Sequence, residues 1–146
     1  MASCVFCDIV AGVVKAFVVY DDPQTLAFLD RAPLLPGHVL VVPKVHIPTL
    51  GDLPAEQVGP YFQVVQRLAA AVEQALQAEG SFVAANIRIS QSVPHLHVHV
   101  VPRWQKDGLF STKLIWKRSP YKDEAERRTA QAKIRRAIEE ISGEEV

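Results

Sequence analysis

Residues 94–103 read Pro-His-Leu-His-Val-His-Val-Val-Pro-Arg and hold three of the chain's five histidines. Histidines and apolar residues alternate here, and a period of two is typical of a β-strand, whose successive side chains point to opposite faces. The apolar side chains would face a core, and the histidines would form a row on the other face at His95, His97 and His99. Neighbours in such a row lie about 6.6 Å apart, too far for all three rings to touch, so we expect the imidazoles to have separate roles.

The row of three histidines is unlike the composition of an ordinary solvent-exposed strand face. A wet face normally carries Lys, Glu, Thr or Ser, and a single histidine would fit that simpler interpretation, but three in register do not. We therefore expect surface-facing imidazoles that do chemistry and contribute little to packing.

Composition limits the classes of protein that fit. The 146 residues are 49% hydrophobic, which is enough for one domain, residues 1–146, with a real core. Sixteen basic residues balance sixteen acidic ones, so no overall field favours a nucleic acid polymer or an anionic membrane as a partner. The chain has no apolar run of membrane-spanning length, and its first residues lack a leader pattern. We expect a soluble, cytoplasmic protein.

The only two cysteines form a Cys-x-x-Cys pair at Cys4 and Cys7. A structural disulfide is unexpected in a cytoplasmic chain, and a redox pair would usually follow a strand and open a helix. Two buried thiols are a simpler alternative. Half of a zinc site is the better interpretation, provided that two more ligands exist.

Histidines can supply those two ligands. Zinc takes four ligands, commonly from Cys and His. His46 lies just past a predicted strand, and His95 is the first of the row. We expect Cys4, Cys7, His46 and His95 to hold one structural Zn²⁺ with no open position.

The rest of the chain predicts an α+β fold with a mostly antiparallel, five-stranded sheet. β-branched, aromatic and apolar runs predict strands at residues 17–20, 25–30, 38–43 and 81–89, and the histidine strand is the fifth. A short extra strand at residues 113–116 is a further candidate.

Two helices are predicted from apolar residues at helical spacing. The long helix spans about residues 60–79, between Gly59-Pro60 and a stop at Gly80, with Asp52 as the cap of an earlier helical start. Its apolar face at Tyr61, Val65, Leu68 and Val72 exceeds what a small sheet must cover, which favours a homodimer. A charged helix at about residues 122–141 has one apolar side.

His97 and His99 remain for chemistry once His95 is assigned to zinc. A histidine can act as a general base or as a nucleophile that forms a covalent intermediate. A nucleophilic ring needs one bare nitrogen, while its other nitrogen donates to an orienting acceptor. The middle histidine, His97, has strand neighbours on both sides. Uncharged groups suited to surround a phosphate lie nearby in sequence at Asn86, Gln91 and Ser92, and on another strand at His38.

At this point the chain resembles the histidine triad (HIT) family of nucleotide hydrolases and transferases. The family motif His-φ-His-φ-His-φ-φ stands here at residues 95–101. Further blocks agree in order: Cys-Val-Phe-Cys-Asp-Ile at 4–9, Val-Tyr-Asp-Asp at 19–22, Leu-Ala-Phe-Leu-Asp at 26–30, and Pro-Gly-His-Val-Leu-Val-Val-Pro-Lys-Val-His at 36–46. The resemblance covers residues 4–105, and residues 106–146 form an extension that matches no family motif.

The resemblance implies a compact α+β domain that usually pairs into a homodimer. It implies that His97 attacks the α-phosphate of a nucleotide, and that water then releases the nucleoside monophosphate from a nucleotidyl-histidine. The positions that would hold the phosphate or serve the leaving group are His38, Gln91, Ser92 and His99. The positions that would form the base and ribose pocket are Phe6, Phe28, Asp30 and Arg31. Family members with Cys-x-x-Cys carry structural zinc at the four positions proposed above.

One departure concerns the segment before Gln91. The family is usually glycine-rich there, with Gly directly before the Gln, whereas this chain reads Asn-Ile-Arg-Ile-Ser at residues 86–90. Residues with side chains therefore stand where the family usually has flexible glycines next to the expected phosphate site. We still assign Asn86 to nucleotide binding.

The expected activity is that of a nucleotide hydrolase or transferase without an organic cofactor. Its substrates would be small molecules: nucleoside phosphoramidates, or dinucleoside polyphosphates such as Ap4A, giving AMP or another nucleoside monophosphate. One alternative is a metal hydrolase in which the alternate histidines all bind a catalytic metal, but a nearby Glu or Asp that such a site usually adds is missing. The other alternative is a nucleotide-binding interaction module with little catalysis.

Overall fold

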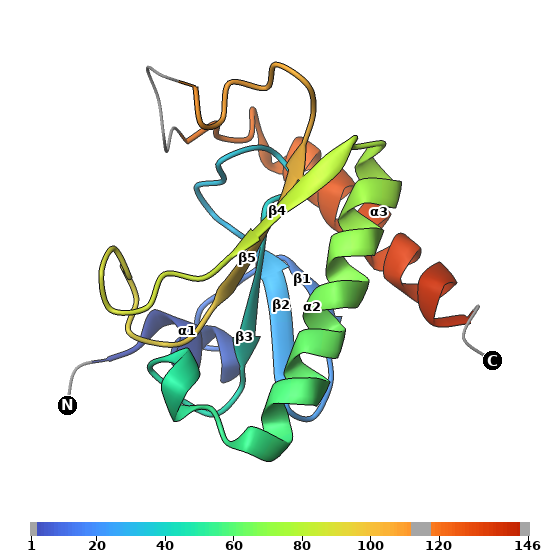
Figure 1. Cartoon of the computed structure of the whole chain (residues 1–146). Helices are drawn as coiled ribbons and strands as arrows, with labels where there is room; N and C mark the ends of the chain where they lie inside the picture. The colour runs from blue at the N-terminus through green and yellow to red at the C-terminus, as the bar shows by residue number, and fades with distance from the viewer. Residues whose placement is uncertain (1–2, 112–117, 144–146) are drawn as a thin grey trace.

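The computed structural model describes residues 3–111 and 118–143. Its centre is a five-stranded antiparallel sheet with the strand order β1-β2-β3-β5-β4, which confirms the predicted α+β class (Figure 1). The strands are β1 (Val18–Asp21), β2 (Thr25–Leu29), β3 (Val39–Pro43), β4 (Gly80–Ala84) and β5 (Val98–Arg103). The candidate strand at residues 113–116 lies outside the described residues.

The apolar strands lie in the middle of the sheet. Every residue of β2 and β3 is buried, as expected for runs that are almost entirely apolar. In the register of the sheet, His99 of β5 lies opposite Leu40 of β3 and Ala84 of β4. The histidine row is thus built into the centre of the sheet, although β5 begins only at Val98.

The predicted strand at 81–89 is too long. β4 ends at Ala84, and the chain then turns through Arg88 and Ser90, which have φ values of 64° and 61°. This left-handed backbone cannot continue a strand. Residues 85–91 are therefore a loop, despite the β-branched residues that suggested a strand.

The long helix α2 (Ala55–Leu76) starts before Pro60 and runs through it, so the predicted interruption at Gly59-Pro60 is wrong. The missing proline N–H removes one hydrogen bond to the carbonyl of Glu56, which is exposed to water. The helix ends where Gln77 takes a left-handed φ of 52°, and Gly80 instead begins β4. Asp52 lies in a short 3₁₀ helix (Leu50–Asp52), where its carboxylate accepts the Thr49 N–H and hydroxyl.

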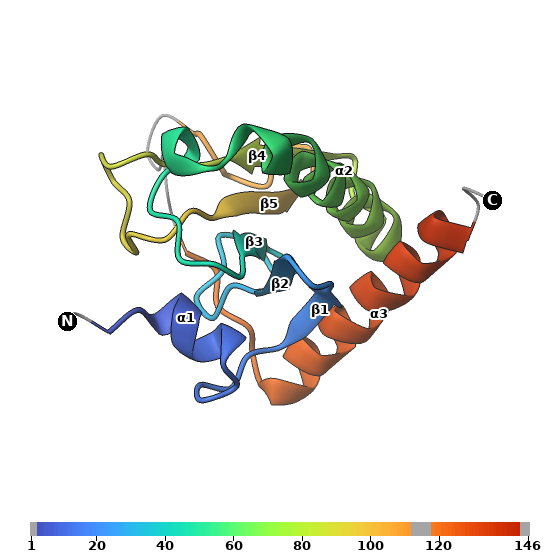
Figure 2. The same cartoon turned by 90° about the horizontal axis from the view of Figure 1, so that it is seen from below.

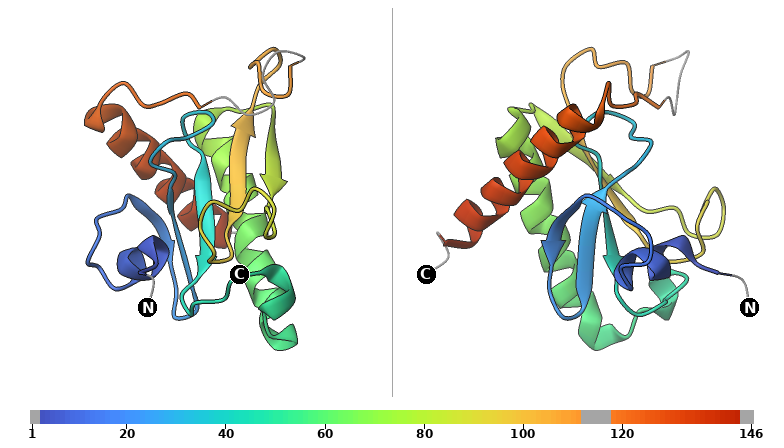
Figure 3. Two further views of the ribbon diagram at one scale, coloured as in Figure 1. Left: turned by 90° about the vertical axis from the view of Figure 1, so that its left-hand side faces the viewer. Right: turned by 180° about the vertical axis from the view of Figure 1, so that it is seen from behind.

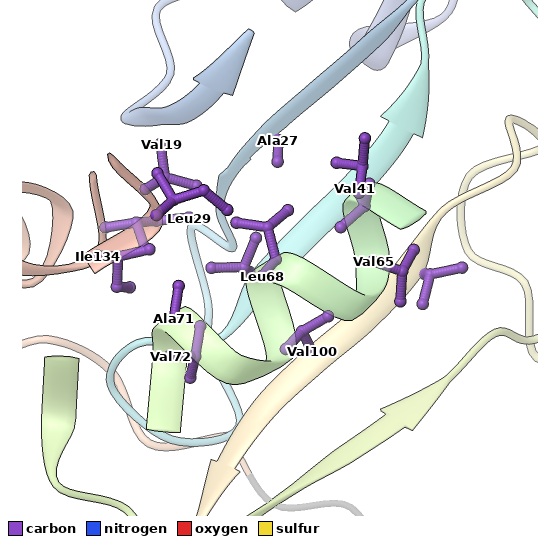
Figure 4. Packing of buried hydrophobic residues seen from close by; sticks show 14 of the residues in the cluster. Val19, Ala27, Leu29, Val41, Val65, Leu68, Ala71, Val72, Val100 and Ile134 are labelled. Carbon is purple, nitrogen blue, oxygen red and sulfur yellow. The ribbon is translucent and has the colours of Figure 1, made fainter. Parts of the chain in front are cut away.

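The C-terminal helix α3 (Glu124–Gly143) confirms the prediction for residues 122–141. It packs diagonally across α2, and both helices lie on one side of the sheet (Figures 2 and 3). Figure 4 shows the core between them, where Leu68 and Val72 of α2 meet Ile134 of α3 and Val100 of β5. The predicted excess of apolar surface on α2 is therefore wrong, because α3 and the sheet bury Tyr61, Val65, Leu68 and Val72.

The other side of the sheet carries the short helix α1 (Val5–Val10), which the sequence did not predict (Figure 2). Phe6 of α1 packs with Phe28 and Leu40 in a second cluster. Strand alternation places His99 on this same side, because its neighbours Val98 and Val100 belong to the first core. In the described part of the chain, no helix is both long and apolar enough to cross a membrane.

Candidate functional site

The histidine row lies beneath α1 and is buried. The exposed fractions of His95, His97 and His99 are 0%, 4% and 5%, so the expectation of surface-facing imidazoles is wrong. The rings of His97 and His99 have centroids 5.0 Å apart, which is direct edge contact. Phe6 packs its ring edge against His97 at the same centroid distance of 5.0 Å. The burial matters because it removes the histidines from bulk water and fixes their orientation.

A cavity of about 290 Å³ opens beside two of these histidines. Its walls include the catalytic candidates His97, His99 and Ser92. They also include all four residues assigned to base and ribose by resemblance, Phe6, Phe28, Asp30 and Arg31. The fold thus brings most of the predicted site to one hollow.

His97 presents a bare nitrogen. Its Nδ1 lies 2.7 Å from the backbone carbonyl of His95. A carbonyl only accepts, so the ring proton is on Nδ1 and the lone pair is on Nε2. Burial lowers the pKa of His97, against smaller opposing effects from this hydrogen bond and from Asp30. The ring is therefore neutral at neutral pH, and its tautomer is the one that a nucleophile requires.

His99 has the opposite tautomer, which His38 imposes. The backbone N–H of Leu34 donates to His38 Nδ1 at 3.0 Å, so the proton of a neutral His38 is on Nε2. That Nε2 lies 2.8 Å from His99 Nδ1, which must accept, and the proton of neutral His99 is therefore on its own Nε2. In the cavity wall, His97 thus carries a lone pair on its Nε2, whereas His99 carries an N–H on its Nε2.

Both supporting histidines are held neutral. Burial lowers the pKa of His99 to about 4, with smaller contributions from His97 and Arg118. Burial also lowers the pKa of His38 well below its ordinary value. Asp30 Oδ2 lies 3.6 Å from His38 Nδ1, but the Leu34 N–H already occupies that nitrogen. Asp30, His38 and His99 also lie close enough to form a group of metal-ligand type, but both nitrogens of His38 and the Nδ1 of His99 are engaged in this hydrogen-bonded chain.

Three residues predicted for the nucleotide site, His38, Gln91 and Asn86, are not among the described residues that line the cavity, and His38 instead contacts the Nδ1 of His99. The side chain of Gln91 accepts the Arg88 N–H at 2.8 Å and donates to the Pro48 carbonyl at 2.7 Å, so it braces its own loop. Asn86 also lies in this loop and is not among the described residues that line the cavity. Their assigned roles stay predictions.

Three charged residues of the cavity wall were missed from the sequence: Lys15, Arg118 and Arg127. Arg118 donates to Asp30 Oδ2 at 2.9 Å across a separation of 88 residues. Arg127 lies over the ring of Phe17, with its Cζ 5.2 Å from the ring centroid. No motif marks these positions, because they come together only when the C-terminal segment packs against the sheet.

The four proposed metal ligands form a compact group. His95 Nδ1 lies 3.5 Å from Cys4 Sγ and 3.6 Å from Cys7 Sγ, and His46 Nδ1 lies 3.3 Å from Cys7 Sγ. A tetrahedral Zn²⁺ separates a sulfur and a nitrogen ligand by about 3.5 Å. His95 Nε2 donates to the Pro43 carbonyl at 2.7 Å, which leaves Nδ1 bare. The donor set and its spacing therefore fit one zinc ion.

Comparisons with known proteins agree with this geometry. The family model described as the HIT domain matches residues 11–106. An uncharacterized HIT-like protein of Saccharolobus solfataricus is 41% identical over 107 residues, which cover 71% of this chain and 76% of that protein. An adenylylsulfatase of Arabidopsis thaliana is 31% identical over 119 residues, which cover 80% of this chain and 60% of that protein.

A solved structure shares the fold along almost the whole chain. The Zn-bound histidine triad family protein from Mycobacterium smegmatis superposes with a TM-score of 0.83 at 37% identity, covering 97% of this chain and 96% of that one. The family model covers more than half of the chain, and the relatives and the shared fold agree with it, so the chain belongs to the histidine triad family.

Proposed function

We propose that this protein is a nucleotide hydrolase or transferase in which His97 attacks the α-phosphate of a bound nucleotide. The observation that carries the proposal is the hydrogen bond from His97 Nδ1 to the His95 carbonyl, because it leaves the Nε2 lone pair available in the cavity wall. Membership of the HIT family supports the same class of activity.

The reaction would take two displacements at phosphorus. In the first, a bond forms between His97 Nε2 and the α-phosphorus, while the bond from phosphorus to the leaving oxygen or nitrogen breaks and its electron pair departs with the leaving group. In the second, water attacks the same phosphorus and loses a proton, which balances the proton that the leaving group takes up. The N–P bond breaks, its electron pair returns to Nε2, and the nucleoside monophosphate is released. The neutral ring of His97 is restored.

The neighbouring side chains have roles that follow from their tautomers and positions. The Nε2–H of His99 donates to a phosphate oxygen or to the leaving atom, and His38 keeps that proton in place. Ser92 is a second donor in the cavity wall. Phe6 and Phe28 offer aromatic surface to the base, and Asp30 accepts from ribose hydroxyls. Arg31, Gln91 and Asn86 complete the predicted set.

The substrate classes that we propose are nucleoside phosphoramidates and dinucleoside polyphosphates such as Ap4A. The relative from Arabidopsis is named an adenylylsulfatase, so adenylyl sulfate belongs in the same test panel. The test is turnover of this panel followed by mass spectrometry of rapidly quenched protein. A mass increase of one nucleotide that maps to His97 supports the proposal. Nucleotide binding without any turnover would instead indicate an interaction module.

We also propose that Cys4, Cys7, His46 and His95 bind one structural Zn²⁺. When bound, the ion would join α1 to the start of the histidine row and contribute free energy to folding. The fit of the ligand distances and the Zn-bound relative from Mycobacterium smegmatis support this proposal. Thiol ligands that must stay reduced also fit the cytoplasm as the location.

A homodimer remains part of the proposal, although the apolar face of α2 at Tyr61, Val65, Leu68 and Val72 no longer supports it, because that face is buried within the chain. The support now comes from exposed apolar residues elsewhere: Val83, on the edge strand β4, is 44% exposed, and Val58 and Phe62 of α2 are each 38% exposed. Sedimentation at micromolar concentration tests it, and a monomer would contradict it.

A further inference from the structure

Arg118 is a cavity residue that lies beyond the region matched by the family model. Its Nη1 donates to Asp30 Oδ2 at 2.9 Å and also to the backbone carbonyl of Ala32. The side chain of Asp30 is only 12% exposed, whereas that of Arg118 is 42% exposed. The pair is therefore a mostly buried carboxylate held from the solvent side by a half-exposed guanidinium.

The backbone around Arg118 is fastened to the loop that carries Asp30. The N–H of Ser119 donates to the Pro33 carbonyl at 2.7 Å. The buried hydroxyl of Tyr121 accepts the Gly37 N–H at 2.9 Å. These two contacts, at Pro33 and at Gly37, fix the backbone next to Arg118. The guanidinium therefore extends toward Asp30 from a fixed point of the chain.

The carboxylate of Asp30 has limited freedom and two acceptor positions to spare. Its backbone N–H donates to the His38 carbonyl at 2.9 Å, and its Oδ1 accepts the Ala32 N–H at 2.9 Å. Arg118 occupies one position on Oδ2. A carboxylate has about four acceptor positions, so about two remain, which matches the two hydroxyls of a ribose.

We propose that Arg118 is a positioning residue for ribose recognition: it holds the Asp30 carboxylate in the orientation that accepts the ribose hydroxyls, and so makes the C-terminal segment part of the nucleotide site. The proposal rests on the proposed function, in which Asp30 faces the ribose. Arg118 acts through Asp30 and needs no contact with the substrate. Without it, Oδ2 would lose its charge-assisted partner and the carboxylate could turn about its side-chain torsions.

The test compares ribose and dideoxyribose ligands in matched variants. Binding of AMP and of 2′,3′-dideoxy-AMP is measured by calorimetry for the wild type, Arg118→Gln, Arg118→Lys and Asp30→Asn, together with the double variant Arg118→Gln/Asp30→Asn. Arg128→Gln is the control, because Arg128 pairs with Glu124 at 2.6 Å on the exposed part of α3. Melting temperatures check that each variant is folded, and KM and kcat are measured for adenosine 5′-phosphoramidate and its dideoxy analogue.

In the wild type, the ribose hydroxyls should strengthen binding by about tenfold or more, as expected for hydrogen bonds to a charged group. Arg118→Gln should weaken AMP binding toward the dideoxy value while leaving dideoxy-AMP binding within about twofold, and Arg118→Lys should recover part of the loss. In the Asp30→Asn background, Arg118→Gln should have no further effect. The loss should fall on KM more than on kcat, and Arg128→Gln should bind like the wild type.

Two results would overturn this proposal while leaving the proposed function intact. If Arg118→Gln weakens AMP and dideoxy-AMP equally, Arg118 binds the phosphate or supports the fold instead of orienting Asp30. If both variants at position 118 discriminate between the ligands as well as the wild type does, the contact has no role in ribose recognition. If the wild type itself binds no AMP and turns over no nucleotide, the proposed function fails first and this proposal fails with it.

Discussion

The Nδ1–H of His97 donates to the backbone carbonyl of His95 at 2.7 Å, two residues earlier in the same row. The first histidine of the row therefore has two functions. Its ring belongs to the group of proposed metal ligands, and its carbonyl sets the tautomer of His97, the proposed nucleophile. Any change that moves the backbone at His95 should reach the reacting nitrogen of His97, so the metal group and the cavity are mechanically connected.

Replacement of His97 should separate chemistry from binding. His97→Ala removes the proposed nucleophile, and turnover should fall by about three orders of magnitude or more. Because the ring is buried against Phe6, we also expect a loss of about 1–2 kcal/mol in the free energy of unfolding. Single-turnover release of AMP and urea denaturation measure the two effects. A variant that still forms the nucleotidyl adduct would show that another residue is the nucleophile.

Two variants should distinguish metal binding from packing. His46 is exposed and His95 is fully buried, yet each supplies one proposed ligand atom. His46→Ala and His95→Ala should both lose zinc and melt at lower temperature, because binding free energy at a structural site contributes to folding. His95→Ala should lose more stability, since it also leaves a cavity and an unpaired Pro43 carbonyl. Elemental analysis and calorimetry provide the data, and full zinc content in either variant would contradict the ligand assignment.

Stability should fall in mild acid because of His99. Burial lowers its pKa from the ordinary value of 6.5 to about 4. Between these two pH values His99 is protonated in the unfolded chain but neutral in the native state. The free energy of unfolding should therefore decrease as the pH falls from 6.5 toward 4, by about 2 kcal/mol between pH 7 and pH 5 from this group. Urea titrations of the wild type and of His99→Gln, both with chelator, measure it. The prediction fails if the variant has the same slope against pH.

The loop before Gln91 should gain stability from glycine. Ser90 has a left-handed φ of 61°, which costs a residue with a Cβ about 1 kcal/mol. Ser90→Gly should therefore raise the free energy of unfolding by up to about 1 kcal/mol and restore the family's usual residue before Gln91. Ala85→Gly, in the same loop but without a positive φ, is the control and should lose about 0.4–1 kcal/mol, because glycine gives the unfolded chain more conformational freedom. If urea denaturation shows that both substitutions change the free energy of unfolding by the same amount, the left-handed backbone of Ser90 is not a source of strain.

Local patterns of the sequence were sufficient to predict the five-stranded sheet, the C-terminal helix and the residues of the histidine row. Alternation at residues 94–103 placed the histidines on one face, because side-chain direction in a strand depends only on the period of two. The apolar runs at β2 and β3 marked the buried centre for the same local reason. The start of α2 was misjudged, because packing of Tyr61 and Val64 against the core outweighs one missing hydrogen bond at Pro60.

Only the tertiary structure decided how the row is used. The tautomers of His97 and His99 depend on the carbonyl of His95 and on the N–H of Leu34, which reaches His99 through His38. Arg118 reaches Asp30 across 88 residues, and no local pattern encodes such a contact. By itself the sequence determined which side chains share a face, because that follows from backbone period. Proton positions, burial and long-range ion pairs were decided by packing, since they depend on neighbours that are distant in the chain.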